Sequence, residues 1–329
     1  MRNTGFRRGP LLAAALATVL AVTGCGGGGG GDAASADGTV SLTLVTTDLY
    51  GYTPLFEARD LQVPGVKITY REFANSAELN SAIEAGQVDI SDTGDIGPIT
   101  AAASGSRQKV IGCTRPNDQN IKYIVRRDSG ITSFADLVGK RVGMPIRSNH
   151  GLLYERLLKK NNLTETQVKA VNIFGADGVN ALVKGDIEAY SANAPGSPDI
   201  LERYPDLVEI DGIAGTVNNL YCLRVSPQAY EQKHAALRSF FQAAAELGLW
   251  ASQHPDEAAQ VVKPHVDYSL TTLSTTYRIS GAGYQPIDDT FLVKQQEFAD
   301  ELLDVEFIEK PVDVKQIFVG DFNDVLPGS

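Results

Sequence analysis

Residues 88–98 read VDISDTGDIGP, and their pattern predicts a strand, a tight turn and a helix in direct succession. The strand ends at Ser91, the turn is Thr93-Gly94-Asp95, and the helix runs over residues 96–103 with Asp95 as its N-cap. A helix start of this kind carries free N–H groups and a partial positive charge, so it can bind a small anion. The same pattern also fits an ordinary strand–turn–helix joint that binds nothing.

Strands and short helices alternate on both sides of this stretch. Such alternation predicts a mostly parallel sheet with helices on both faces, whose ligands bind at the carboxyl ends of the strands. The loop at 46–52 and the turn at 93–95 lie at such ends. The predicted strands here are 41–46, 66–73, 88–91 and 109–113, and the helices are 54–61, 76–85 and 96–103.

A second α/β unit follows a Pro-Asn-Asp loop at 116–118. A strand at 220–225 then leads into a helical tail, in which one helix opens at Ser226-Pro227 and another is capped by Asp288 or Asp289. The first of these helices has an apolar, partly aromatic face, which we expect to lie in the core: Leu237, Phe240, Phe241, Ala244 and Leu247. Two α/β units with strand-like crossings near 119–124 and 220–224 indicate two hinged lobes. The predicted strands of the second unit are 122–127, 141–144, 169–174, 187–191 and 208–210, and its helices are 133–137, 150–160, 176–184 and 196–203.

The first residues predict export. Three arginines precede an apolar run at 11–22, which is too short to span a membrane and is typical of a secretion signal. Cys25 follows Thr-Gly directly and resembles the cysteine of a bacterial lipobox, which becomes the lipidated first residue of the mature chain. The alternative is a plain signal with a free cysteine. We expect residues 1–24 to be the signal peptide and 25–39 a Gly-rich tether, with the protein anchored outside the cell membrane.

Without residues 1–24, which hold three Arg and no acidic residue, the net charge is (29 − 3) − 40 = −14. An acidic surface argues against nucleic acid as a partner and suits an exported protein. An anion site must then be built locally, from dipoles and hydrogen bonds. We also expect a monomer.

Cys113 and Cys222 form a candidate disulfide in an oxidising compartment. Both lie in apolar, strand-like stretches, and we favour two buried thiols. The four histidines are scattered, and the sequence contains no CxxC, GxSxG or HExxH motif. Neither a metal nor a cofactor is expected.

Four stretches carry a family resemblance. They are AIEAGQVDISDTGDIGPITAAASG (82–105), ITSFADLVGKRVGMP (131–145), the Ser148-Asn149-His150 turn with its helix, and the segment 281–314. In this order and spacing they resemble the substrate-binding lipoproteins of ABC importers for aliphatic sulfonates, taurine and nitrate, over most of residues 40–320.

The resemblance implies an α/β, two-lobe fold of the type II periplasmic-binding-protein class, a clamshell with two hinge crossings. Lobe 1 would comprise residues 40–119 and 222–329, and lobe 2 residues 120–221. It also implies a small anionic solute, most simply an aliphatic sulfonate or taurine, and delivery of that solute to a permease–ATPase complex.

One departure from the family bears on the ligand. Asn193-Ala194-Pro195 stands where members often have Trp-Asp-Pro, and Asp48-Leu49-Tyr50 adds polar bulk to the first loop. The ligand is therefore expected to be larger or more polar than a short alkylsulfonate.

The expected ligand contacts come from the strand ends and helix starts of both lobes. Thr93 and the N–H groups of Gly94 and Asp95 would hold the anionic head, while Asp48 suits either a ligand ammonium group or a turn. His150 fits a ligand contact or the protein surface equally. Arg147 could pair with the anion, but we favour a solvated surface arginine, and Asn218, Asn219 and Tyr221 fit the hinge. The candidate ligand-binding residues are Thr46, Thr47, Asp48, Tyr50, Tyr52, Thr93, Gly94, Asp95, Ser148, Asn149, His150, Asn193 and Tyr284.

Two alternatives stay open. A pyrimidine-like or other heterocyclic solute would be favoured if Tyr50, Tyr52 and Tyr284 stack around one flat slot. An enzyme on the same fold would need an acid–base pair in the cleft, and it would be favoured by a carboxylate bonded to His150.

Overall fold

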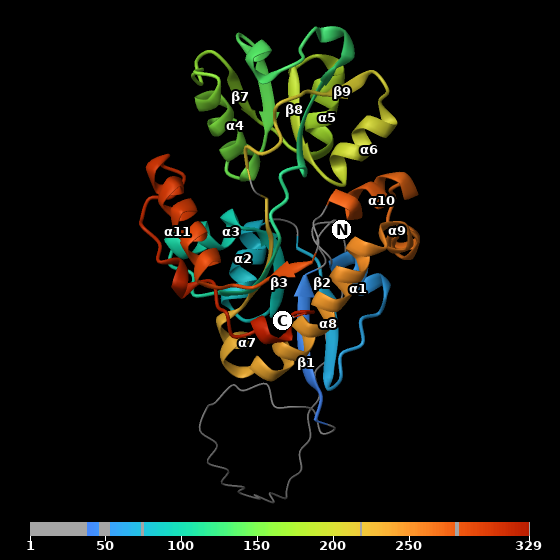
Figure 1. Ribbon diagram of the computed structural model, residues 1–329, viewed down its shortest axis with the longest axis vertical. Helices are drawn as coiled ribbons and strands as arrows, with labels where there is room; N and C mark the ends of the chain where they lie inside the picture. Colours follow the sequence, from blue (N-terminus) through green and yellow to red (C-terminus); the bar gives the residue numbers. More distant parts are fainter. Residues whose placement is uncertain (1–37, 46–52, 74–75, 218, 280–282, 329) are drawn as a thin grey trace, which may run out of the picture. The chain divides into compact units, whose positions relative to one another are not determined.

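A computed structural model of the protein describes residues 38–45, 53–73, 76–217, 219–279 and 283–328. They belong to one compact unit, residues 33–329, and contain two separate β-sheets, each with its own helices (Figure 1). We call the part built on the first sheet lobe 1 and the part built on the second lobe 2. The α/β class and the two lobes are confirmed, whereas the predicted lobe bounds stay a prediction.

The sheet of lobe 1 has six strands from two distant stretches of the chain. The strand order is β11 (Tyr284–Gln285), β4 (Lys109–Thr114), β10 (Tyr221–Val225), β3 (Ile90–Gly94), β1 (Val40–Val45) and β2 (Val66–Arg71). Strands β1 to β4 belong to the stretch of chain before lobe 2, and β10 and β11 belong to the stretch after it. Strand β10 therefore inserts between two strands of the first stretch, β4 and β3.

The sheet of lobe 2 has five strands from one continuous stretch. Its buried residues alternate between two apolar clusters, so helices cover both faces as expected. The strand order is β7 (Lys169–Asn172), β6 (Arg141–Met144), β8 (Ala189–Asn193), β5 (Ile121–Arg126) and β9 (Leu207–Glu209).

The sheets are less parallel than predicted. Strands β1, β2 and β3 run parallel, as do β6, β7 and β8, but β10 is antiparallel to β3 and β4, and β5 is antiparallel to β8 and β9. The short edge strand β11 is also antiparallel to its neighbour β4. Strands β10 and β5 are those through which the chain enters a lobe from the other one. Such a strand starts at the edge where its neighbours end, so it must run against them.

The predicted crossings near 119–124 and 220–224 lie a few residues later in the chain than the observed ones. Residues 121–126 and 221–225 are strands inside the two sheets, and the chain passes between the lobes just before each of them. There the two passing segments pair with each other: the N–H of Asn117 donates to the carbonyl of Asn219 (3.2 Å) and the N–H of Asn219 donates back (3.3 Å).

Most predicted helices are present, with small shifts at their ends. The helix expected to open at Ser226-Pro227 is two helices, because α7 stops at Gln232 and α8 restarts at His234. Asp288 caps α11 by accepting the N–H of Phe291, as predicted. In lobe 1 the helices are α1 (Thr53–Ala58), α2 (Ser76–Glu84), α3 (Ile96–Ala103), α7 (Pro227–Gln232), α8 (His234–Gln253), α9 (Pro255–Val262), α10 (Leu270–Ile279) and α11 (Asp289–Asp304).

In lobe 2 the helices are α4 (Asn149–Lys160), α5 (Gly175–Lys184) and α6 (Gly196–Arg203). Short 3₁₀ turns complete the described chain. They are η1 (Arg127–Ser129), η2 (Phe134–Leu137), η3 (Lys263–His265), η4 (Val314–Gln316) and η5 (Asn323–Val325).

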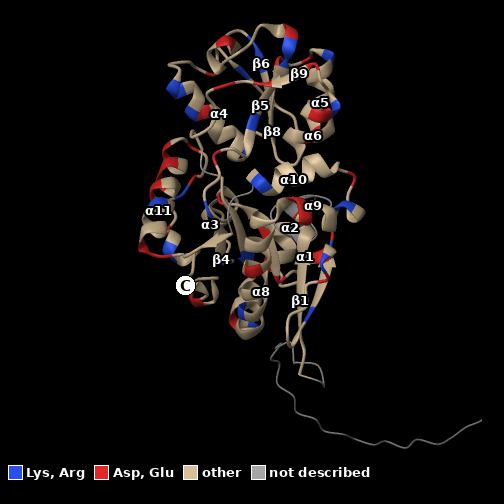
Figure 2. Ribbon diagram, turned by 45° about the vertical axis from the view of Figure 1, so that its right-hand side comes forward, with Lys and Arg blue, Asp and Glu red and all other residues tan. Residues whose placement is uncertain are grey.

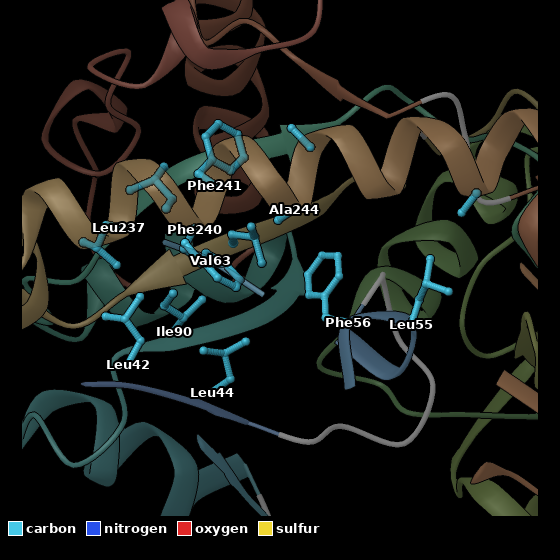
Figure 3. Packing of buried hydrophobic residues seen from close by; sticks show 14 of the residues in the cluster. Leu42, Leu44, Leu55, Phe56, Val63, Ile90, Leu237, Phe240, Phe241 and Ala244 are labelled. Carbon is cyan, nitrogen blue, oxygen red and sulfur yellow. The ribbon is translucent and has the colours of Figure 1, made fainter. Parts of the chain in front are cut away.

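The apolar face of α8 forms the centre of lobe 1 (Figure 3). Phe240 and Phe241 are fully buried, and the ring of Phe240 meets that of Phe56 edge-on at 5.9 Å. This confirms the predicted role of the aromatic stripe in the core. The apolar face of α8 lies in one cluster with these residues of the sheet: Leu42, Leu44, Ile90, Leu223 and Val225.

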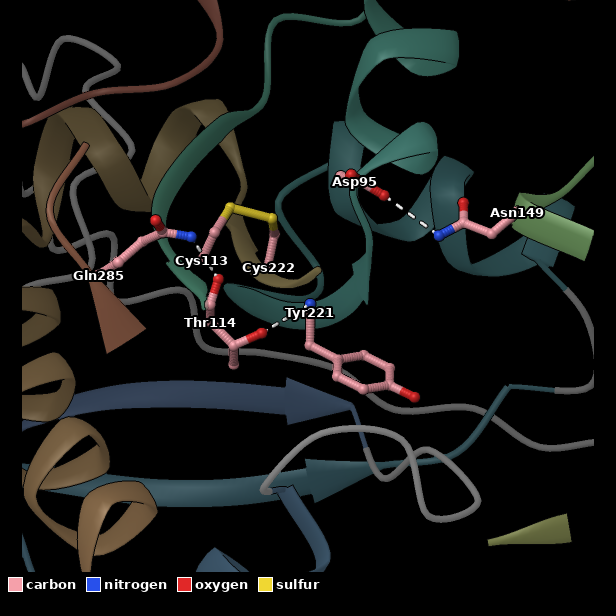
Figure 4. The surroundings of a disulfide bond; sticks show 7 residues. All are labelled: Asp95, Cys113, Thr114, Asn149, Tyr221, Cys222 and Gln285. Atoms are coloured by element: carbon pink, nitrogen blue, oxygen red, sulfur yellow. Dashed lines mark hydrogen bonds between the residues drawn. A yellow bond between two sulfur atoms is a disulfide. The ribbon is translucent and has the colours of Figure 1, made fainter. Parts of the chain in front are cut away.

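Cys113 and Cys222 form a disulfide, so the expectation of two free thiols is wrong (Figure 4). The two residues stand opposite each other on the antiparallel strands β4 and β10, with Cα atoms 4.0 Å apart. A cross-strand pair of this kind brings two sulfur atoms within bonding distance. The bond joins the two stretches of chain that build lobe 1.

Acidic and basic residues are mixed along the outer helices, for example on α11 (Figure 2). In the part of the chain that the structure describes, no helix combines the length and apolar character needed to cross a membrane.

Candidate functional site

The start of α3 in lobe 1 lies against the start of α4 in lobe 2. Gly94, the last residue of β3, approaches Asn149 so closely that a Cβ at position 94 would lie 3.4 Å from the side-chain nitrogen of Asn149. The end of one parallel strand and the beginning of two helices therefore meet at one place. This is the arrangement in which α/β proteins bind ligands.

Asp95 at the start of α3 does not cap the helix as predicted. Its backbone has helical angles, and its carboxylate makes no capping hydrogen bond; it accepts the Nδ2–H of Asn149 instead (3.2 Å, Figure 4). The residue is 3 % exposed. Burial raises the pKa of Asp95 to about 7, against the opposing effects of Asn149, the N–H of Ile96 and the charge of Arg156.

Ser148 is the N-cap of α4, and its hydroxyl group takes part in two hydrogen bonds within lobe 2. It accepts the N–H of His150 (3.2 Å) and donates to the carbonyl of Pro145 (2.7 Å). The loop before the helix folds back tightly here, because a Cβ on Gly151 would lie 1.8 Å from the carbonyl oxygen of Ile146. Ser148 thus shapes the helix start, and its hydroxyl proton is already donated.

Asn149 links three parts of the molecule. Its Nδ2 group donates to Asp95 of lobe 1 and to the side-chain oxygen of Asn219 in the passing segment. The side chain is 8 % exposed. The bond from Asn149 to Asp95 can form only while the two lobes are close together, because moving the lobes apart breaks it.

His150 is a neutral group at this site. Its Nδ1 atom lies 2.8 Å from the hydroxyl of Ser191, which is buried on β8. Desolvation lowers the pKa of His150 to about 4, so the ring carries no charge near neutral pH. It can exchange hydrogen bonds with a ligand but offers no positive charge to an anion.

Buried amides line the passing segments next to this cluster. The Nδ2 group of Asn120 donates to the hydroxyl of Tyr221 (2.7 Å), and its side-chain oxygen accepts the N–H of Ala194 (3.2 Å). Asn219 and Tyr221 are thus part of the hinge structure, as considered from the sequence. Asn117 and Asn120 were missed, although the PNDQN run at 116–120 marks the loop that holds them.

The other predicted residues are scattered around this cluster. Thr93 lies on β3 opposite Cys222, and Asn193 ends β8 opposite Ile121. The ring of Tyr284 packs edge-on against Phe241 at 5.1 Å. Arg147 lies over the ring of Phe307 at 5.4 Å. Outside the described residues lie Cys25, Thr46, Thr47, Asp48, Tyr50, Tyr52 and Asn218.

Two polar contacts join the lobes on either side of the cluster. Arg156 of α4 donates from Nε (2.8 Å) and Nη2 to the two carboxylate oxygens of Glu301 of α11, and from Nη1 to the carbonyl of Thr216 (2.9 Å). Glu202 of α6 accepts the hydroxyls of Ser269 and Thr272. Sequence reasoning missed these contacts, because the partners lie far apart along the chain and carry no local signal.

Within the described residues, no group of three or more His, Cys, Asp or Glu side chains is arranged to hold a metal ion. The chemistry of the cluster is that of neutral amides and hydroxyls, together with one buried carboxyl group. It provides hydrogen bonds rather than ligands for a metal.

The chain is similar to sulfonate-binding proteins. A sequence profile described as NMT1/THI5 like matches residues 61–258. A putative aliphatic sulfonates-binding protein of Escherichia coli K12 is 26 % identical over 258 residues, which cover 77 % of this chain and 79 % of that protein. A protein of the same description from Bacillus subtilis 168 is 21 % identical over 258 residues, or 78 % of each chain.

Solved structures share the fold. The alkanesulfonate-binding protein SsuA from Xanthomonas axonopodis pv. citri, bound to MOPS, superposes with a TM-score of 0.74 at 19 % identity, over 85 % of this chain and 98 % of that one. A desulfurization enzyme, DSZB, superposes with a TM-score of 0.64 at 16 % identity, over 87 % and 98 % of the two chains. The same fold therefore supports binding proteins and enzymes.

Proposed function

Because the chain belongs to the NMT1/THI5-like family, we propose that it is the solute-binding protein of an ABC importer. It binds an aliphatic sulfonate, or taurine, between its two lobes and delivers the solute to a membrane permease. The observation that carries this proposal is the contact of Asn149 with Asp95, which brings helix starts of the two lobes together. The relatives named for sulfonates support the class of ligand.

A sulfonate head needs several hydrogen-bond donors when it is buried. The Thr93 hydroxyl and the Gly94 N–H would supply donors from lobe 1, and the amide of Asn149 a donor from lobe 2. Asn149 would then exchange its bond with Asp95 for one to the ligand. A ligand held from both sides favours the closed arrangement of the lobes, because only that arrangement makes all of the contacts.

Binding is tested by calorimetry on the full mature chain with ethanesulfonate, taurine, nitrate and sulfate. We expect a sulfonate to bind, and absence of binding to every one of these anions would overturn the proposal. Buffers such as MOPS must be avoided, because they are themselves sulfonates.

Thr93→Ala tests the proposed anion contact. Loss of a buried donor should weaken sulfonate binding by about 1 kcal/mol. Thr69→Ala is the matched control, since Thr69 lies on β2 of the same sheet with its side chain exposed. Equal affinities of the two variants would assign Thr93 to the scaffold.

The anchor is a further part of the proposal. We infer that Cys25 is lipidated and holds the protein at the outer face of the bacterial cell membrane, with the permease–ATPase complex as its partner and the protein itself a monomer. Metabolic labelling with an alkyne fatty acid should mark the wild-type chain. Cys25→Ala should abolish the label, and a label that persists in this variant would contradict the assignment.

An enzyme is the second candidate, because Ser191 and His150 form a hydroxyl–imidazole pair 2.8 Å apart. Two observations weigh against it. His150 bonds to a hydroxyl rather than to a carboxylate, and its pKa of about 4 makes it a weak base near neutral pH. An enzyme would convert a bound sulfonate or sulfinate, whereas a binding protein returns it unchanged, as mass spectrometry would reveal.

A further inference from the structure

Asp95 is a buried acid inside the proposed anion site. The residue is 3 % exposed, and its carboxyl group receives the Nδ2–H of Asn149 (3.2 Å) and the backbone N–H groups of Asp95 itself and of Ile96. All three donors are neutral. The carboxyl group therefore has hydrogen bonds but no ion-pair partner in direct contact among the groups that act on it.

The charged groups around Asp95 compensate its charge only in part. From α4, Arg156 lowers the pKa of Asp95, but its guanidinium is bound to Glu301 of α11. His150, also on α4, is neutral near pH 7. Asn219 contributes an amide, and α3 has no acidic or basic residue in its first or last turn.

A sulfonate brought to the starts of α3 and α4 would place a second negative charge beside this carboxyl group. Two anions in one buried site destabilise each other, and one of them must take up a proton. A sulfonate is a very weak base, so the proton must go to Asp95. Burial already raises the pKa of Asp95 to about 7, so this protonation is accessible near neutral pH.

We propose that Asp95 is a specificity-determining residue that couples anion binding to the uptake of one proton from solvent, held on its own carboxyl group. The protonated carboxyl group donates a hydrogen bond to the anion, and the ionised group repels it. This inference rests on the proposed function, because it needs the anion to lie between the two helix starts.

Linkage fixes the pH dependence. Below about pH 6 Asp95 is protonated before the ligand arrives, and the affinity is constant. Above about pH 7 each bound anion must bring a proton, so the affinity falls by close to tenfold for each pH unit.

The experiment is calorimetry of the full mature wild-type chain with ethanesulfonate between about pH 5.5 and about pH 8.5. At about pH 8, heats measured in two buffers of different ionisation enthalpy, neither of them a sulfonate, give the number of protons taken up. We expect close to one proton per anion there.

Asp95→Asn removes the titrating group and should bind with an affinity that is constant over the same range. Asp288→Asn is the matched control: Asp288 also stands at a helix start, is exposed, and caps α11, a role that asparagine fills equally well. It should keep the wild-type pH profile.

The outcomes separate the two proposals. Sulfonate binding with no proton uptake and less than a twofold change in affinity across the range would overturn the role of Asp95 and leave the proposed function standing. No sulfonate binding at any pH would overturn the proposed function and this inference with it. Because proton uptake is measured on the wild-type protein, the result does not depend on the folding of a variant.

Discussion

Lobe 1 is assembled from two stretches of chain separated by the whole of lobe 2, whereas lobe 2 is continuous. The difference appears in the contacts that hold each lobe. In lobe 1 the disulfide and a buried ion pair connect the first stretch to the second: Lys233 bonds to Asp89 at 3.0 Å and to the carbonyl of Ser41 at 3.0 Å. In lobe 2 the ion pair Lys122–Glu209, with a similar separation of 3.1 Å, is half exposed and joins strands of one sheet.

A discontinuous lobe needs strong links between its pieces. Without them, the loop-closure entropy of the inserted chain opposes assembly of the sheet. A continuous lobe pays less of this entropy and can rely on its apolar clusters. Two ion pairs with nearly the same N···O distance should therefore contribute very different amounts to the stability of the two lobes.

Removing the disulfide should give the largest effect. In the double variant Cys113→Ala and Cys222→Ala, the free energy of unfolding should fall by about 4 kcal/mol, because the bond closes a loop with a sequence separation of 109 residues. Urea unfolding gives the loss. Hydrogen exchange should locate the weakening in lobe 1, and equal loss of protection in both lobes would break the comparison.

Asp89→Asn should come next. It removes the carboxylate charge that faces Lys233, which is 9 % exposed, and breaking a buried ion pair costs about 3 kcal/mol. Thermal and urea unfolding measure the loss. Adding Lys233→Met should restore much of it; a double variant as unstable as the single one would show that the charge is not the cause.

Asp95→Asn acts at the junction of the lobes. The folded-state pKa of Asp95 is raised from 3.8 to about 7, so the group favours folding at low pH, and this stability is lost as the pH rises from about 4 to about 7. Relative to wild type, the free energy of unfolding of the variant should rise across that window by about 1.4 kcal/mol for each pH unit. A difference between the two proteins that does not change with pH would contradict the assigned environment.

Glu209→Gln in lobe 2 should have the smallest effect. The pair with Lys122 is partly solvated, and such pairs contribute about 0.5 kcal/mol or less. Unfolding under the conditions used for Asp89→Asn gives the direct comparison at nearly equal ion-pair distance. A loss as large as that of Asp89→Asn would remove burial as the explanation of the difference.

Local patterns predicted the elements well. The helix at Ile96–Ala103, the strand at Arg141–Met144 and the cap at Asp288 depend on neighbouring residues, and the structure has them where expected. The core role of Phe240 and Phe241 also followed from helical spacing.

Features that depend on distant partners could not be predicted. An apolar strand around Cys113 fits a thiol and a disulfide equally, and only the register of β4 on β10 decides between them. Asp95 stands at the cap position of α3, but its carboxylate accepts the amide N–H of Asn149 from the other lobe and makes no capping hydrogen bond. The direction of β10 likewise follows from its entry out of lobe 2.

The disulfide also sets how the molecule transmits force. A pull on the two ends of the chain passes from Cys113 to Cys222 through the sulfur–sulfur bond, across Cα atoms 4.0 Å apart. The chain of lobe 2 lies outside this load path. The segment between the two cysteines, with a sequence separation of 109 residues, would extend by about 380 Å at about 3.5 Å per residue, and the disulfide prevents this extension. Tension on the chain ends therefore loads lobe 1 and leaves the second wall of the proposed site unstretched.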